Sequence, residues 1–312
     1  MAQHYGILAA VIIGVVVAFG LWVATRSVTR SQDYRKISRR WTAPQPTVEQ
    51  LIANLRKLMR KFEDDHRARI ITIIHDIPDE IGPHTGELRF YLSLEQAFEI
   101  LEQIRTTPKD IPIAVVLHTP GGEVLATELV AAALKDRTAP TTAYVPYMAM
   151  SGGTMVALAC DRIIMGKHAT LGPIDSQFAG FPAHSFQRLL KDKPVDKIGD
   201  QALLLAYIVE TRMKTANKRA RELVNKHHDK DGDHKAVDFL SSGELYHGER
   251  ITLAQAKELK LNVEGDCPRA MFDMVDAQLK ILRRPDNIVG AEPLSQKDKP
   301  PLLTSLFQPW DW

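Results

Sequence analysis

Two glycine-marked turns contain the residues best suited to chemistry in this 312-residue chain. The first is HTPGGEV at residues 118–124, directly after the apolar run IAVVL. The second is YMAMSGGTMVALA at residues 147–159, directly after TTAYVP. Both patterns predict a turn from a strand into a helix. Ser151 would then lie at a helix N-terminus, whose free N–H groups favour negative charge, and the adjacent glycines let a substrate backbone approach closely.

The Ser151 turn alone allows two interpretations. The position is that of a nucleophile elbow, although the string G-x-S-x-G is absent because Ala149 and Met150 precede the serine. Serine is also a common N-cap residue with no chemical role, and PGG is also a common tight turn. Neither turn matches a dinucleotide-binding or phosphate-binding fingerprint.

A serine nucleophile needs a base, and the sequence offers histidines and lysines. His118 precedes PGG and His168 follows the next predicted strand, but no spacing rule ties either one to Ser151. A lysine whose pKa is lowered by loss of solvent would also serve, because its neutral amine accepts the serine proton. Lys197 precedes a long helix with an apolar face and is the candidate lysine; a solvated surface cation is the ordinary alternative.

The segment HHDKDGDH, residues 227–234, contains side chains that bind metals. It lacks the calcium-loop pattern and has no helical pair of ligands four residues apart placed against a partner. We therefore expect a solvated loop between helices, with no metal.

The two turns require a framework of strands and helices. Short apolar runs predict strands at Ile70–His75, Ile113–Leu117, Thr142–Pro146 and Arg162–Met165. Helical spacing of apolar residues predicts helices at Thr47–His66, Leu94–Arg105, Gly122–Lys135, Ser151–Cys160, Ile198–His227, Thr252–Lys260 and Arg269–Leu282. Strands that alternate with helices of this length predict an α/β domain with a largely parallel sheet.

The overall composition excludes several classes of protein. The chain is 45% hydrophobic and 25% charged, which is globular and neither disordered nor collagen-like. A formal net charge of +2 argues against a broad nucleic-acid surface, so no nucleic-acid partner is expected. Two cysteines, Cys160 and Cys267, are too few for a disulfide framework and fit a reducing compartment.

Residues 1–25 contain no Lys, Arg, Asp or Glu. The apolar stretch Gly6–Ala24 is long enough for a bilayer core of about 30 Å, and it lacks the basic n-region of a cleaved signal peptide. We therefore predict an uncleaved transmembrane anchor rather than a signal peptide or a core helix. By the positive-inside rule, the domain after the anchor lies on the cytoplasmic side of the cell inner membrane, because basic residues follow directly: Arg26, Arg30, Arg35, Lys36, Arg39 and Arg40.

Taken together and in this order, the two turns resemble those of the ClpP/crotonase-fold membrane peptidases. That group includes signal peptide peptidase A and the NfeD-type proteases, and the chain resembles above all the serine dehydrogenase proteinase (SDH-type) subgroup. The resemblance covers roughly residues 65–282. Its matching stretches are VVLHTPGGEVLA (115–126), AYVPYMAMSGGTMVALACDRIIMGKHATLGPIDSQ (143–177), VDKIGDQALLLAYIVE (195–210) and LSSGELYHGERITLAQAKELKL (240–261).

The resemblance implies an α/β ClpP/crotonase-like fold of repeated β-β-α units, with an N-terminal transmembrane helix. It implies a Ser-Lys dyad of Ser151 as nucleophile and Lys197 as base. A histidine base is less expected, because this chain has Pro173 at about the place of the ClpP histidine. The implied oxyanion hole consists of backbone N–H groups, and no metal or cofactor is required. The glycines of this oxyanion hole are Gly121 or Gly122, together with Gly152. Three other lysines compete with Lys197 for the role of base: Lys191, Lys193 and Lys214.

The predicted function is a membrane-anchored serine endopeptidase that cleaves peptides or membrane-protein segments and, by analogy with its relatives, forms a homo-oligomer. The alternatives are a non-proteolytic membrane scaffold and a crotonase-type acyl-CoA enzyme. The predicted organisation is an anchor at 1–25, a basic juxtamembrane linker and helix at 26–64, the peptidase domain at 65–283 and an irregular tail at 284–312.

Overall fold

The computed structural model describes residues 46–76, 91–174, 177–178, 181–243, 245 and 248–283. The predicted anchor at 1–25 and the predicted tail at 284–312 lie outside these residues. Among the residues described, no helix has both the length and the apolar character needed to cross a membrane. Contacts divide the chain into two units, residues 1–47 and residues 48–312. The domain boundaries at 25, 64 and 283 stay predictions.

The centre of the second unit is a five-stranded parallel sheet with the strand order β1-β2-β3-β5-β10. Its strands are β1 (Arg69–Ile74), β2 (Ile113–His118), β3 (Thr141–Val145), β5 (Arg162–Met165) and β10 (Val263–Glu264). The four predicted strands are all present, within one residue of their expected ends. The predicted α/β domain with a parallel sheet is therefore confirmed.

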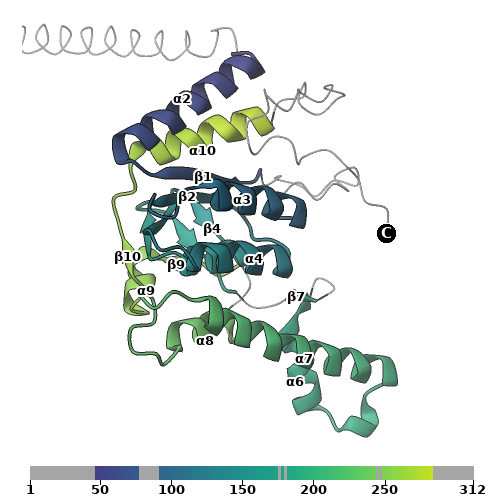
Figure 1. The fold of residues 1–312 in the computed structure, drawn as a ribbon. Helices are drawn as coiled ribbons and strands as arrows, with labels where there is room; N and C mark the ends of the chain where they lie inside the picture. Colours follow the sequence, from purple (N-terminus) through teal and green to yellow (C-terminus); the bar gives the residue numbers. More distant parts are fainter. Residues whose placement is uncertain are drawn as a thin grey trace, which may run out of the picture. The chain divides into compact units, whose positions relative to one another are not determined.

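Both faces of the sheet are apolar and buried. Since successive side chains of a strand point to opposite faces, each strand contributes to the core on both sides. In β1, Ile71 and Ile73 belong to the larger core cluster, whereas Ile70 and Ile74 belong to a second cluster on the other face. Helices cover both faces, as parallel sheets require. Figure 1 shows α2 (Val48–His66) and α10 (Arg269–Leu282) side by side on one face, and α3 (Leu94–Thr106) and α4 (Val124–Lys135) on the other.

The remaining helices complete the unit. They are α5 (Gly152–Ala159), α6 (Ala183–Asp192), the 3-10 turn η1 (Val195–Lys197), α7 (Asp200–Leu223), α8 (Lys235–Ser241) and α9 (Leu253–Glu258). The sequence did not predict α6 or α8, and α7 ends four residues before the predicted His227. The helix α6 packs against α7 through Ala183, Val209 and Met213.

A second, smaller sheet lies next to the turn at Ser151. It contains β4 (Met148–Ala149), β6 (Thr170–Leu171) and β9 (Ile251–Thr252), with β4 parallel and β9 antiparallel to β6. A separate hairpin pairs β7 (Gln177–Phe178) with β8 (Phe181–Pro182). Strands of two residues have no readable period, which is why the sequence did not predict them. The succession β3–β4–α5 forms one β-β-α unit; its repetition along the chain stays a prediction.

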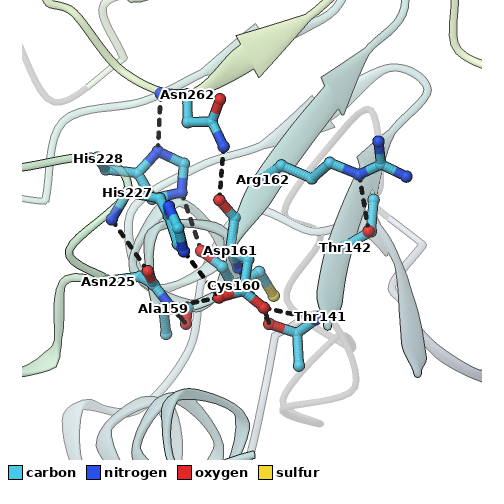
Figure 2. Close-up of polar contacts among 10 residues, drawn as sticks. All are labelled: Thr141, Thr142, Ala159, Cys160, Asp161, Arg162, Asn225, His227, His228 and Asn262. Atoms are coloured by element: carbon cyan, nitrogen blue, oxygen red, sulfur yellow. Dashed lines mark hydrogen bonds and ion pairs between the residues drawn. The ribbon is translucent and has the colours of Figure 1, made fainter. Parts of the chain in front are cut away.

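The loop after α7 differs from its prediction, because His228 is only 3% exposed. Its Nδ1 accepts a hydrogen bond from the backbone N–H of Asn262 at 3.0 Å. The neutral ring must then hold its proton on Nε2, which donates to the carbonyl oxygen of Cys160 at 2.9 Å. Figure 2 shows this ring between the two segments. The prediction of a solvated loop is therefore wrong for His228.

The carboxylate of Asp161, directly before β5, fixes the same region. Its oxygens accept hydrogen bonds from the backbone N–H of Thr141 at 2.7 Å and from the side-chain amide of Asn225 at 3.1 Å (Figure 2). The loop after α7 is thus tied to the central sheet by polar contacts. Within the described part of the chain, no group of three or more His, Cys, Asp or Glu side chains could hold a metal ion.

We expect folding stability to fall in acid because His228 is buried in its neutral form. Burial lowers the pKa of His228 from 6.5 to about 4. The unfolded chain therefore binds this proton more readily, so the stabilisation is complete above pH 6.5 and is lost as the pH falls to 4. The loss from this group is about 3 kcal/mol. Urea unfolding midpoints at a series of pH values measure it.

The matched variant is His228→Asn, which has no titrating group at this position. Its unfolding free energy should change less between pH 7 and pH 4.5 than that of the natural chain. Some dependence will remain, because burial also lowers the pKa of His75 to about 4. Equal slopes for the two proteins would contradict the prediction.

Candidate active site

Ser151 lies between β4 and α5 with φ +49° and ψ −118°, which is unusual for a residue other than glycine. It occupies the N-cap position of α5, but its side chain makes no capping hydrogen bond. The simple N-cap interpretation therefore does not describe what this hydroxyl does. Backbone strain of this kind costs about 1–3 kcal/mol and is concentrated at functional sites.

Thr154, the threonine of SGGT, holds the serine turn in place. It is fully buried, and its hydroxyl lies 2.7 Å from the carbonyl oxygen of Ala149 and 2.9 Å from that of Gly172. The same oxygen accepts the N–H of Gly172 at 2.9 Å. One side chain thus ties the first turn of α5 to β4 and to the LGP segment.

The two glycine turns lie in direct contact. A Cβ added at Gly121, where φ is +133°, would lie 2.9 Å from the Cβ of Ser151 and 3.2 Å from the N of Gly152. A Cβ added at Gly152 would lie 3.1 Å from the N of Gly122 and 2.4 Å from the Oγ1 of Thr127. The structure therefore brings together four of the five residues that the sequence singles out for the site.

The N–H groups of the three glycines differ in their partners. That of Gly121 donates to the Oγ1 of Thr119 at 3.1 Å. Within the described residues, those of Gly122 and Gly152 donate to no other group. The sequence left Gly121 and Gly122 as alternatives, and the hydrogen bonds leave Gly122 as the free donor of the two.

A cleft of about 740 Å³ opens beside these donors. Its walls come from the two glycine turns, from α4 and from the second half of α7. The described residues that line it include three charged side chains and no lysine or histidine. The lining consists of Tyr91, Pro120, Gly121, Gly122, Glu123, Val124, Thr127, Glu128, Ser151, Gly152, Met155, Ile174, Ala216, Arg219, Ala220 and Leu223.

Lys197 lies away from this cleft within the single chain. It is an exposed residue of η1, directly before α7. The helix α7 starts at Asp200 but reaches the cleft only from Ala216 onward, and that length of helix spans roughly 24 Å. One chain therefore does not bring Lys197 to Ser151, and its role as base stays a prediction.

The competing bases do not line the cleft either. Lys191 and Lys193 are exposed beside η1, and Lys214 forms an ion pair with Glu210 at 2.9 Å. The ring of His118 packs edge-on against Tyr147, and burial lowers the pKa of His118. The other candidate, His168, is exposed and lies outside the cleft lining.

Some residues of the site had no signal in the sequence. Leu92 encloses the PGG turn, because its N–H donates to Gly121 and its carbonyl oxygen accepts from Glu123, both at 2.9 Å. Thr119 and the buried His75 lie behind the same turn. Their partners are more than 20 residues away or are backbone atoms, so neither composition nor periodicity could indicate them.

Comparison with known families assigns this chain to one class of protein. Residues 40–299 match the family of ClpP-like SDH-type serine proteinases. The chain belongs to this family, so its parallel α/β domain is a ClpP-like fold and its general activity is that of a serine peptidase. The predicted resemblance to the SDH-type subgroup is confirmed.

Two archaeal proteins of Methanocaldococcus jannaschii are similar in sequence. The chain is 38% identical to uncharacterized protein MJ0137 over 245 residues, which is 78% of this chain and 84% of that protein. It is 35% identical to uncharacterized protein MJ1495 over 237 residues, which is 75% of this chain and 79% of that protein.

Two solved structures are similar at 13% sequence identity. One is a serine-to-alanine mutant of the 1510-N membrane-bound stomatin-specific protease, with a TM-score of 0.42 over 65% of this chain and 81% of that one. The other is ClpP1 from Listeria monocytogenes, with a TM-score of 0.41 over 70% of this chain and 99% of that one.

We expect alanine at Gly121 or Gly152 to lower the free energy of unfolding by about 1–3 kcal/mol. The added Cβ meets Ser151 of the opposite turn at Gly121, and it meets Thr127 of α4 and the N of Gly122 at Gly152. At Gly121 the positive φ adds strain. The matched control is Gly199→Ala, where no atom lies within 4 Å of an added Cβ; it should change the value by no more than about 0.5 kcal/mol. Urea titration measures the free energy of unfolding of all three variants. If Gly121→Ala and Gly152→Ala lost no more than Gly199→Ala, the close contact would be disproved.

Proposed function

We propose that this protein is a membrane-anchored serine endopeptidase in which Ser151 is the nucleophile. The observation that supports it most directly is the arrangement around the serine. A hydroxyl without a capping role lies beside the N–H groups of Gly122 and Gly152, which donate to no other group among the described residues, at the edge of a cleft. Within a family of serine peptidases, these are the parts that acyl transfer needs.

The reaction follows from these parts. The Oγ of Ser151 attacks the carbonyl carbon of a peptide bond while the base takes the hydroxyl proton. The resulting oxyanion accepts hydrogen bonds from the N–H groups of Gly122 and Gly152, and one such donor is typically worth about 2.7–4 kcal/mol in the transition state. The base then protonates the leaving amine, and water releases the acyl group from the serine oxygen.

We assign the base to Lys197 and infer that a second copy of the chain supplies it. The described lining of the cleft includes no lysine or histidine, and Lys197 is exposed in η1, directly before α7. Apolar side chains near it are exposed as well: Val195 at 52%, Leu204 at 61% and Tyr207 at 50%. A homo-oligomer that buries this apolar surface would give Lys197 both a partner cleft and the desolvation that lowers a lysine pKa.

The substrates we propose are peptides or segments of membrane proteins. The cleft is open enough for an extended chain and has apolar side chains, such as Met155 and Leu223, beside charged ones. The anchor at residues 1–25 would hold the cleft at the cytoplasmic face of the membrane. Neither a cofactor nor a nucleic acid takes part in this proposal.

A fluorophosphonate probe tests the nucleophile and the base in the full-length protein. We expect labelling of the natural chain, none of Ser151→Ala, and a loss of at least about 100-fold in Lys197→Ala. Lys193→Ala and Lys214→Ala are matched controls that should be labelled at the natural rate. Co-expression of Ser151→Ala with Lys197→Ala should restore labelling of the intact serine, because each copy supplies what the other lacks.

Three results would change this proposal. A folded chain that is not labelled at all contradicts peptidase activity and favours the scaffold alternative. Labelling that persists in Lys197→Ala but is lost in Lys191→Ala, Lys193→Ala or Lys214→Ala identifies another base. If labelling does not recover in the co-expressed variants, although both are folded and oligomeric, a second copy does not supply the base.

Deletion of residues 1–25 tests the anchor. The full-length chain should remain with membranes after alkaline carbonate extraction, whereas the shortened chain should be released into the supernatant. A membrane-impermeant protease applied from the periplasmic side should leave residues 48–283 intact. Extraction of the full-length chain by carbonate contradicts the anchor, and digestion from that side contradicts the orientation.

A further inference from the structure

A chain of buried hydrogen bonds leads from α3 through His75 to the PGG turn. His75 directly follows β1 and is 1% exposed. Its Nε2 lies 2.9 Å from the Oε1 of Gln96, and its Nδ1 lies 2.8 Å from the Oγ1 of Thr119. That same Oγ1 accepts the N–H of Gly121 at 3.1 Å.

In this series of hydrogen bonds, the chemistry of each group determines which atom donates and which accepts. The Oε1 of Gln96 also accepts the N–H of Ser93 in the capping box of α3, so the oxygen is the atom that faces His75. An amide oxygen only accepts, so Nε2 of His75 must be the protonated nitrogen. Burial lowers the pKa of His75 to about 4, which keeps the ring neutral. Nδ1 is then an acceptor, and the hydroxyl of Thr119 must donate to it.

This direction decides whether the Thr119 hydroxyl donates a hydrogen bond to the turn or accepts one from it. The hydroxyl has a second acceptor within reach, the carbonyl oxygen of Gly121 at 2.9 Å, but one proton serves one bond. That carbonyl oxygen already accepts the N–H of Leu92 at 2.9 Å. When the hydroxyl donates its hydrogen bond to His75, a lone pair of the Thr119 oxygen accepts the N–H of Gly121.

We propose that His75 is a positioning residue for the oxyanion hole: through the Thr119 hydroxyl it binds the N–H of Gly121 and so fixes the turn in which the N–H of Gly122 stays free. This rests on the proposed function, since it assigns the arrangement of the same site. His75 does not contact the reacting atoms. It holds the peptide group between Pro120 and Gly121, which directly precedes the peptide group that carries the Gly122 N–H. A donor that is misaligned loses most of its stabilisation of the transition state.

The experiment compares variants at both ends of the His75–Thr119 bond in the full-length chain. His75→Leu and Thr119→Val remove the bond, whereas His75→Asn and Thr119→Ser keep a polar atom near each position. We expect the first pair to lower kcat for peptide cleavage and the acylation rate by roughly tenfold to a hundredfold with KM unchanged. The second pair should retain rates within a few-fold of the natural chain. The double variant His75→Leu, Thr119→Val should be no slower than either single variant.

Amide hydrogen exchange, resolved to single residues, tests the hydrogen bonds without any need for activity. The Gly121 amide should be protected in the natural chain and should exchange at least about tenfold faster in His75→Leu. If His75→Leu does not fold, Thr119→Val measured against Thr119→Ser gives the same comparison.

The outcomes separate this inference from the proposed function. No labelling at Ser151 of the natural chain contradicts the proposed function, and exchange at Gly121 still decides whether His75 governs the turn. An active natural chain with unchanged kcat in folded His75→Leu contradicts the positioning role alone. Equal losses in His75→Leu and His75→Asn, or a change confined to the melting temperature, reduce His75 to a packing residue and also contradict it.

Discussion

The close approach of two backbone turns is the constraint on which the rest of this site depends. A Cβ added at Gly121 would overlap the Cβ of Ser151 on the opposite turn, and a Cβ added at Gly152 would lie tight against the N of Gly122 and overlap Thr127 of α4. Because this contact has no room for a side chain, glycine backbone lines the cleft directly beside Ser151. Ser151 completes the arrangement, since its backbone is strained and its side chain makes no capping hydrogen bond to α5.

The fold supplies the two turns at the right place because both follow neighbouring parallel strands. Carboxyl ends of parallel strands meet at one edge of a sheet, which is where such folds bind ligands. The turn after β2 and the turn after β3 and β4 are held together there by the pairing of Thr119 with Ala149. Two apolar cores, one on each face, keep these strands in register. Buried polar side chains, Thr154 on one turn and Thr119 on the other, then fix the turns themselves.

Much of the fold and of the site could be predicted from the sequence, because the signals lie in short continuous segments. Runs such as IAVVL and TTAYV have the apolar character of strands buried on both faces, and PGG and SGG mark the turns that follow. The short strands β4, β6 and β9 could not be predicted, because two residues have no period. The burial of His228 could not be predicted either: its partners, Cys160 and Asn262, are 68 and 34 residues away, in segments that only folding brings together.

The sequence by itself determined the class of protein, since the order of the two turns and the stretches around them identify an SDH-type ClpP-like serine peptidase. It also determined which serine and which glycines are the candidates, because only those residue types suit such turns. Among the described residues, the tertiary structure alone decided which glycine N–H is free, because the Gly121 N–H donates to the Thr119 hydroxyl, which in turn contacts His75 at the end of β1. It also placed Lys197 in η1, directly before α7, where a single chain leaves it exposed. Sequence spacing measures distance along the chain, whereas hydrogen bonds and active sites depend on distance through space.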